Sequence, residues 1–201
     1  MAEDRDLVAA VTEALMSHAN VRAVELVGSR AIGSALPLSD WDFVVSIDAV
    51  DAVLAALPSL VAPLHPLAQQ WDPLGPTTYR CFMLMLRGPV KVDLIFPGVP
   101  HEPAPPWTPA PGTLEAIDRH FWDWILWLTS KEQGGRDDLV REQLAVMSHH
   151  LLRPLGVEDV PGTIPRATLE YVTARDRLAE RYGMRVPLAL EHEVRPALPT
   201  G

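Results

Sequence analysis

The N-terminal half of the chain switches between helical and strand-like spacing of its apolar residues. In residues 4–19, apolar side chains recur at helical spacing after several acidic residues, which predicts an amphipathic helix. Residues 21–28 and 40–47 are short apolar runs rich in β-branched side chains, so we expect a buried strand in each. The pattern then predicts a helix over 48–57 that ends at Pro58.

A later apolar segment adds two more strands. Residues 81–96 are interrupted by Arg87-Gly88-Pro89, and a break of this kind between two apolar runs predicts a β-hairpin. Helices and strands are therefore interspersed along this half. We expect an α+β fold with a mixed sheet.

A proline-rich segment separates this half from the remainder. Residues 97–112 contain seven prolines, a density that excludes a helix or a central strand and favours a stiff extended connection. We therefore predict an N-terminal domain over residues 1–98, a linker over 99–112 and a C-terminal domain over 113–201.

The C-terminal domain has helical periodicity throughout. We expect one helix capped by Thr113, a second that begins at Asp137 or Asp138, and a third that begins near Pro165 and ends at Gly183. These helices predict a small bundle. Asp118 and Asp123 are expected on its solvated face, or facing a cationic ligand.

Composition and charge narrow the class of protein. The chain has 201 residues, 48% of them hydrophobic, which indicates a folded globular protein. It has no apolar run long enough for a membrane span and no signal-like start, so we expect no membrane partner and a cytoplasmic location. Cys81 is the only cysteine, which excludes an internal disulfide and a zinc site built on several thiolates. The net charge of −9 counts against a long nucleic acid as partner.

The stretch GSRAIGSALPLSDWDF, residues 28–43, contains the candidate chemistry. Gly28-Ser29 follows a predicted strand, where a glycine backbone and a hydroxyl can approach a phosphate. Asp40 and Asp42 lie two residues apart on the next strand and therefore project from one face. Paired carboxylates repel one another unless a cation lies between them, and Mg²⁺ prefers such oxygen ligands. Asp93, the one acidic residue in the apolar strand VKVDLIF, can complete the set if the two strands are neighbours.

This ordered pattern resembles the DNA polymerase β-like nucleotidyltransferase superfamily. The Gly-Ser turn, the paired acids and the third acid on a later strand match its signature, and the two-domain arrangement is similar to that of small antibiotic nucleotidyltransferases, which modify aminoglycosides or lincosamides. The resemblance covers about residues 21–96. The helical half is similar only in outline. It implies a polymerase β-like domain followed by a helical bundle.

The resemblance also implies an activity and its site residues. The protein would transfer a nucleoside monophosphate, commonly AMP, from a nucleoside triphosphate to a hydroxyl of a small acceptor, with release of pyrophosphate. Gly28 and Ser29 would hold the triphosphate. Two Mg²⁺ ions, or Mn²⁺ in their place, would bind to Asp40, Asp42 and Asp93, and Asp93 or another acid would serve as the base.

Three cationic residues and two alternative functions complete the expectations. Arg30 and Lys131 are candidate triphosphate ligands, and Arg136 is a weaker one; each can equally be a solvent-exposed charge. One alternative function is toxin-like nucleotidylation of a tRNA or a protein, of which the tRNA case predicts a basic groove. The other is a non-catalytic nucleotide-binding module, which three intact acids disfavour. A monomer and a homodimer are both compatible with the sequence.

Overall fold

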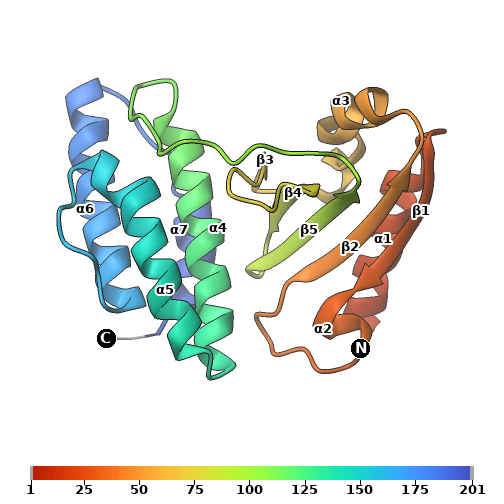
Figure 1. The fold of residues 1–201 in the computed structure, drawn as a ribbon, viewed down its shortest axis with the longest axis horizontal. Helices are drawn as coiled ribbons and strands as arrows, with labels where there is room; N and C mark the ends of the chain where they lie inside the picture. Colours follow the sequence, from red (N-terminus) through yellow and green to blue (C-terminus); the bar gives the residue numbers. More distant parts are fainter. Residues whose placement is uncertain (1, 200–201) are drawn as a thin grey trace. The chain divides into compact units, whose positions relative to one another are not determined.

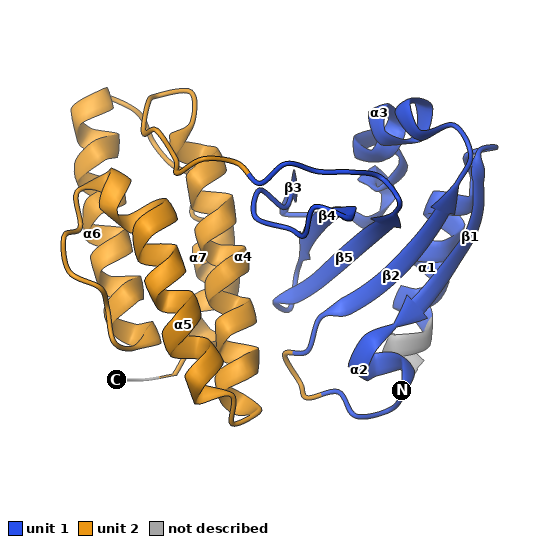
Figure 2. Cartoon of the chain, in the orientation of Figure 1, with its two compact units in different colours: residues 1–35, 39–103 blue, residues 36–38, 104–201 orange. Residues whose placement is uncertain are grey.

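The protein divides into two compact units (Figure 2). The computed structural model describes residues 2–199, with side chains from Asp6 onward. Unit 1 comprises residues 1–35 and 39–103, and unit 2 comprises residues 36–38 and 104–201. The change of unit between residues 103 and 104 falls inside the proline-rich segment.

Unit 1 is built on a five-stranded mixed sheet with the strand order β1-β2-β5-β4-β3 (Figure 1). The pairing of β2 with β5 is parallel, and the other three pairings are antiparallel. The predicted α+β class, mixed sheet and β4–β5 hairpin are thereby confirmed. Strand β3 was not predicted, because its two glutamines weaken the apolar signal of a short segment. The strands are β1 (Val21–Val27), β2 (Trp41–Ile47), β3 (Ala68–Trp71), β4 (Tyr79–Leu86) and β5 (Val90–Pro97).

The apolar core of unit 1 lies on one face of this sheet. Helices α1 (Ala2–Met16) and α3 (Val50–Leu60) supply Val11, Leu15 and other apolar side chains to it. Alternate residues of the strands complete the core, because successive side chains of a strand point to opposite faces. Those from the two central parallel strands include Trp41, Phe43, Val45, Val92, Leu94 and Phe96.

Helix α3 extends past the proline at which we expected it to end. Pro58 lies inside the helix, which continues to Leu60. A proline removes one helical N–H, and near a C-terminus this loss affects only one hydrogen bond. The next turn is intact, since the Val61 N–H donates to the Leu57 carbonyl at 3.0 Å.

Unit 2 is a helical bundle in which α4 contacts each of the other α-helices that unit 2 contains. Short π-helical and 3₁₀ segments follow α5. The bundle confirms the predicted helices. The short α7 was not predicted. The helices are α4 (Leu114–Gln133), α5 (Asp137–Met147), α6 (Ile164–Tyr182) and α7 (Ala189–Val194).

The first helix of the bundle does not begin with the expected side-chain cap. Thr113 directly precedes α4, but its hydroxyl donates to the Thr108 carbonyl at 2.8 Å and accepts from the Ala110 N–H at 2.9 Å. The threonine thus stabilises the turn before the helix. Thr163, by contrast, accepts from the Arg166 N–H at the start of α6.

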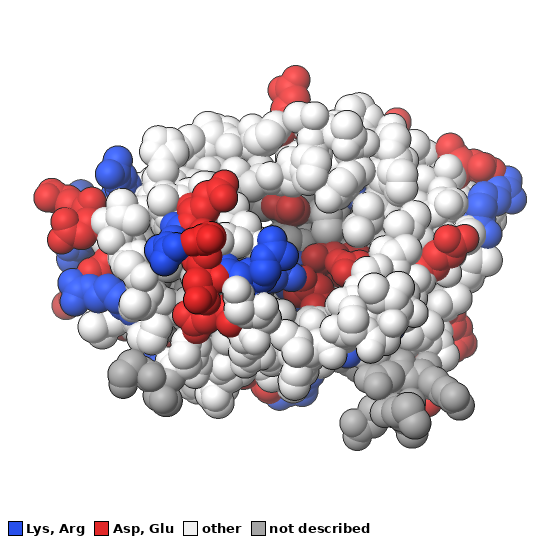
Figure 3. Space-filling view, turned by 60° about the horizontal axis from the view of Figure 1, so that its bottom comes forward, with Lys and Arg blue, Asp and Glu red and all other residues white. Residues whose placement is uncertain are grey.

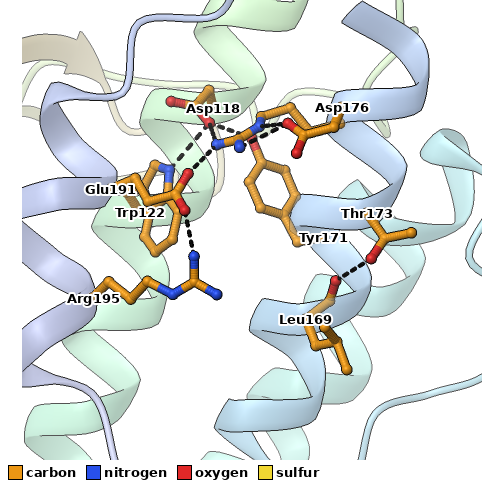
Figure 4. A network of polar contacts seen from close by, with 9 residues as sticks. Asp118, Trp122, Leu169, Tyr171, Thr173, Asp176, Glu191 and Arg195 are labelled. Atoms are coloured by element: carbon orange, nitrogen blue, oxygen red, sulfur yellow. Dashed lines mark hydrogen bonds and ion pairs between the residues drawn. The ribbon is translucent and has the colours of Figure 1, made fainter. Parts of the chain in front are cut away.

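A buried charged network joins three helices of unit 2 (Figure 4). Asp118 is 2% exposed and accepts hydrogen bonds from Trp122 at 3.1 Å, Tyr171 at 2.7 Å and Arg175 at 3.2 Å. Arg175 also donates to Glu191 at 2.7 Å, so it links α6 to both α4 and α7. The expectation of a solvated Asp118 was wrong.

Asp123 is likewise buried, at 5% exposure. The expectation of a solvated helix face was therefore wrong for Asp123 as well.

The second half of the proline-rich segment packs on this bundle. The Trp107 indole donates to His120 Nδ1 at 2.9 Å, and the Trp107 backbone N–H donates to the His150 carbonyl at 3.0 Å. The Tyr182 hydroxyl donates to the Pro109 carbonyl at 3.1 Å. These bonds explain why residues from 104 onward belong to unit 2.

Basic and acidic side chains are interspersed on the face of the protein that Figure 3 shows. On the face drawn in Figure 3, Lys and Arg side chains form small separate groups, several of them beside acidic side chains. None of the helices within residues 2–199 is long and apolar enough to cross a membrane.

Candidate metal centre

The parallel pairing of β2 with β5 brings the predicted acids together. Asp42 and Asp93 are direct partners in the register of the two strands, so their side chains lie on the same face of the sheet. Asp40 directly precedes β2. Carboxylate oxygens of Asp40, Asp42 and Asp93, hereafter the acid cluster, lie within 4.8 Å of one another.

The acid cluster has the ligand chemistry of a divalent-cation site. Asp40 is 7% exposed, and Asp42 and Asp93 are half-buried, so water screens their mutual repulsion only in part. Carboxylate oxygens at this spacing fit Mg²⁺ or Mn²⁺, which prefer hard oxygen ligands and retain open positions for phosphates. The neighbouring Trp41 and Phe43 are buried in the core on the other face of the sheet.

Gly28 brings the backbone against this cluster. It opens the short helix α2 (Gly28–Ala31) directly after β1, and its φ of +71° is one that glycine adopts without strain. A Cβ at this position would collide with Asp42 Oδ2. Both the backbone conformation and the close approach to Asp42 therefore favour glycine at this position. The adjacent Ser29 is half-buried, and its carbonyl accepts from the Ser34 N–H at 2.9 Å.

Arg30 contacts the residues on both sides of Asp40. Its guanidinium lies over the Trp41 ring at 4.1 Å, and its Nε donates to the Ser39 carbonyl at 2.9 Å. Arg30 thus connects α2 to the residues that flank Asp40. Its assignment as a triphosphate ligand stays a prediction.

The two cations predicted from the helical half belong to unit 2. Lys131 lies in the last turn of α4, with its ammonium 5.1 Å from the centre of the Trp127 ring. Arg136 is exposed and directly precedes α5. Their roles toward a triphosphate also stay predictions.

Lys91 is a residue of the site that sequence reasoning missed. It precedes Asp93 by two positions on β5, and its ammonium forms an ion pair with Asp93 Oδ1. The Lys91 side chain is only 5% exposed. The pattern Lys-x-Asp in VKVDLIF was the available signal, because residues two apart on a strand share a face.

Asp72 and Tyr79 also interact with the acid cluster and were missed. Burial raises the pKa of the Asp72 carboxyl, while the Leu74 N–H, which donates to it at 2.8 Å, and the charge of Lys91 oppose that rise. Burial likewise raises the pKa of the Tyr79 phenol, and the nearby acidic groups of Cys81, Asp72, Asp93 and Asp42 add to this rise. Asp72 lies in a Pro- and Gly-containing segment, a composition that is typical of turns.

Comparison with known proteins adds no family to this description. No protein-family model matches the sequence, and no match was found among curated proteins. A functional proposal therefore depends on the geometry of the acid cluster and on the motif pattern around it.

Proposed function

We propose that the protein is a metal-dependent nucleotidyltransferase. It transfers a nucleoside monophosphate, AMP in the first instance, from a nucleoside triphosphate to a hydroxyl of a small acceptor and releases pyrophosphate. The acceptor class that the motif resemblance suggests is aminoglycoside-like. The acidic net charge of the chain is compatible with a cationic acceptor.

One observation supports this proposal above all others. Three carboxylates on or beside two adjacent parallel strands converge within 4.8 Å, and the backbone of Gly28 approaches one of them so closely that a Cβ there would displace the Asp42 carboxylate. A cation site beside an exposed glycine-serine turn suits a metal-bound triphosphate. Structural ion pairing alone does not require the glycine.

The proposed reaction is a displacement at the α-phosphorus. The acceptor oxygen forms a bond to this phosphorus, the bond to the oxygen that bridges the α- and β-phosphates breaks, and pyrophosphate leaves. Divalent ions held by the acid cluster would neutralise the phosphate charge and would make the attacking oxygen a better nucleophile. Gly28 and Ser29 would orient the triphosphate, and Asp93 would accept the proton of the acceptor hydroxyl.

The test is a transfer assay with α-labelled nucleoside triphosphates. The full chain is incubated with each triphosphate, Mg²⁺ or Mn²⁺, and a panel of small hydroxyl acceptors that includes aminoglycosides. We expect labelled acceptor and pyrophosphate in equal amounts, with ATP among the substrates. The variant that carries both Asp40→Asn and Asp42→Asn should form neither product.

Two results would contradict the proposal. The first is failure of the wild-type chain to bind a triphosphate in the presence of either metal, measured by calorimetry. The second is transfer that continues at the wild-type rate in the double variant or in excess chelator.

A further inference from the structure

Lys91 places a buried positive charge beside a group of candidate metal ligands. Its ammonium is nine-tenths buried and is held against Asp93 by the geometry of β5, since both residues project from the same face. Lysine is almost never buried unless it is paired. The chain therefore supplies a fixed positive charge to the acid cluster.

This charge changes what the acid cluster can bind. Three carboxylates and one ammonium have a formal charge of minus two, or minus three with an ionised Asp72, so one divalent ion balances all or most of this charge and a second exceeds it. A second divalent ion in the absence of nucleotide would leave excess positive charge in a site that water screens only in part. A triphosphate supplies the negative charge that a second ion requires.

We propose that Lys91 is a resident counter-ion that limits the nucleotide-free protein to one divalent ion. Asp40 and Asp42 hold that ion while Lys91 stays paired with Asp93. The Asp93 carboxylate accepts a second ion only when a triphosphate is present. Lys91 is thus a positioning residue that acts through Asp93, and this inference rests on the proposed nucleotidyltransferase function.

The experiment counts Mn²⁺ ions bound to the full chain without nucleotide, by calorimetry and by electron paramagnetic resonance. Wild type should bind one ion. Lys91→Met should bind two, or bind the first ion ~10-fold or more tightly, because a repelling charge is gone. Lys91→Arg, which keeps the charge, should behave as wild type.

A charge-matched control comes from the same hairpin. Arg87→Met removes a positive charge from the exposed end of β4–β5 and should leave the number and affinity of Mn²⁺ ions unchanged. Melting temperatures of the variants provide a second, independent measurement. Lys91→Met should be less stable than wild type without metal, and Mn²⁺ should raise its melting temperature by more than it raises that of wild type.

Each failure has its own signature. If folded Lys91→Met binds Mn²⁺ with the wild-type number and affinity, or if wild type binds two ions without nucleotide, the role of Lys91 is wrong while the metal site stands. If wild type binds no Mn²⁺ with or without a triphosphate, the proposed function itself is wrong. A Lys91→Met chain that folds and binds no ion would also overturn the counter-ion role.

Discussion

Asp42 and Asp93 occupy partnered positions on the neighbouring parallel strands β2 and β5, although fifty-one positions separate them in the sequence. This register, more than either residue alone, creates the acid cluster. A shift of one residue in either strand would turn its aspartate into the apolar core on the opposite face. The packing of Trp41, Phe43, Val92 and Leu94 in that core therefore fixes the geometry of the site.

Asp42→Asn should abolish stabilisation by divalent ions together with transfer. The substitution removes one ligand charge, and it also relieves repulsion within the acid cluster, so the metal-free melting temperature should stay level or rise. Melting curves with and without Mg²⁺ measure both effects. Asp48→Asn is the matched control, because Asp48 directly follows β2, is exposed and pairs with Arg22. An unchanged Mg²⁺ response in Asp42→Asn would refute the ligand role.

Gly28→Ala should damage the site more than its backbone strain explains. Gly28 and Gly33 have nearly equal positive φ values, +71° and +73°, so alanine at either position costs ~1 kcal/mol of conformational strain. Only at Gly28 does the new Cβ collide with Asp42, while nothing lies within 4 Å of it at Gly33. Mn²⁺ and triphosphate affinities should fall in Gly28→Ala and stay near wild type in Gly33→Ala. Equal losses in the two variants would remove the argument from close approach.

The sequence was enough to predict which acidic residues form the candidate site. It was not enough to predict that their strands are neighbours. Asp40 and Asp42 were recognisable because strand geometry places residues two apart on one face. Asp93 was recognisable as a charge in an apolar strand. The pairing of β5 with β2 depends on contacts between residues that are distant in the sequence. The alternation of apolar and polar residues within one strand carries no information about such contacts. For the same reason Asp72, which follows a strand two positions away from β5 in the sheet, could not be assigned to the site from the sequence.

Arg175→Met should strongly destabilise unit 2. Arg175 is 2% exposed and pairs with the buried carboxylates of Asp118 and Glu191, so its removal leaves Asp118 without this cation and Glu191 with Arg195 alone. The loss of a partner from such a pair costs about 3–5 kcal/mol. Asp176→Asn is the matched control, since Asp176 also pairs with Arg175 but is 61% exposed, and its loss should cost at most ~1 kcal/mol. Denaturant unfolding measures both values, and similar costs would contradict the role assigned to burial.

His150 should make unit 2 less stable in mild acid. Burial, aided by the charge of His149, lowers the pKa of His150 below its usual value of 6.5. The unfolded chain therefore binds the proton more readily, so the stability that neutral His150 contributes is present above about pH 6.5 and is lost as the pH falls. Unfolding free energies at pH 7 and pH 5 should differ less in His150→Gln than in wild type. The exposed neighbour His149 is the control, and His149→Gln should retain most of the wild-type difference.

The misjudged residues share a physical cause. Asp118 has helical neighbours that suggest an exposed polar stripe, yet α4 packs against α5, α6 and α7, and Trp122, Tyr171 and Arg175 satisfy the carboxylate. Lys91 was missed for a related reason, because the sequence does not show that this charged side chain is buried against Asp93. In both cases a paired charge is buried, and the polarity of a residue does not by itself report its burial.

Asp93→Asn should separate chemistry from nucleotide binding. Asn keeps the shape of the side chain and can still accept a hydrogen bond from Lys91, but it carries no charge for a metal ion and accepts no proton. If Asp93 serves as the base, the single-turnover transfer rate should fall by ~10²–10⁴-fold or more. Triphosphate affinity, supported by Gly28 and the remaining two acids, should change much less. Calorimetry and rapid-quench transfer on the same preparation measure the two quantities. A loss of affinity as large as the loss of rate would make Asp93 chiefly a ligand for nucleotide-bound metal, and wild-type values of both would place Asp93 outside the working site.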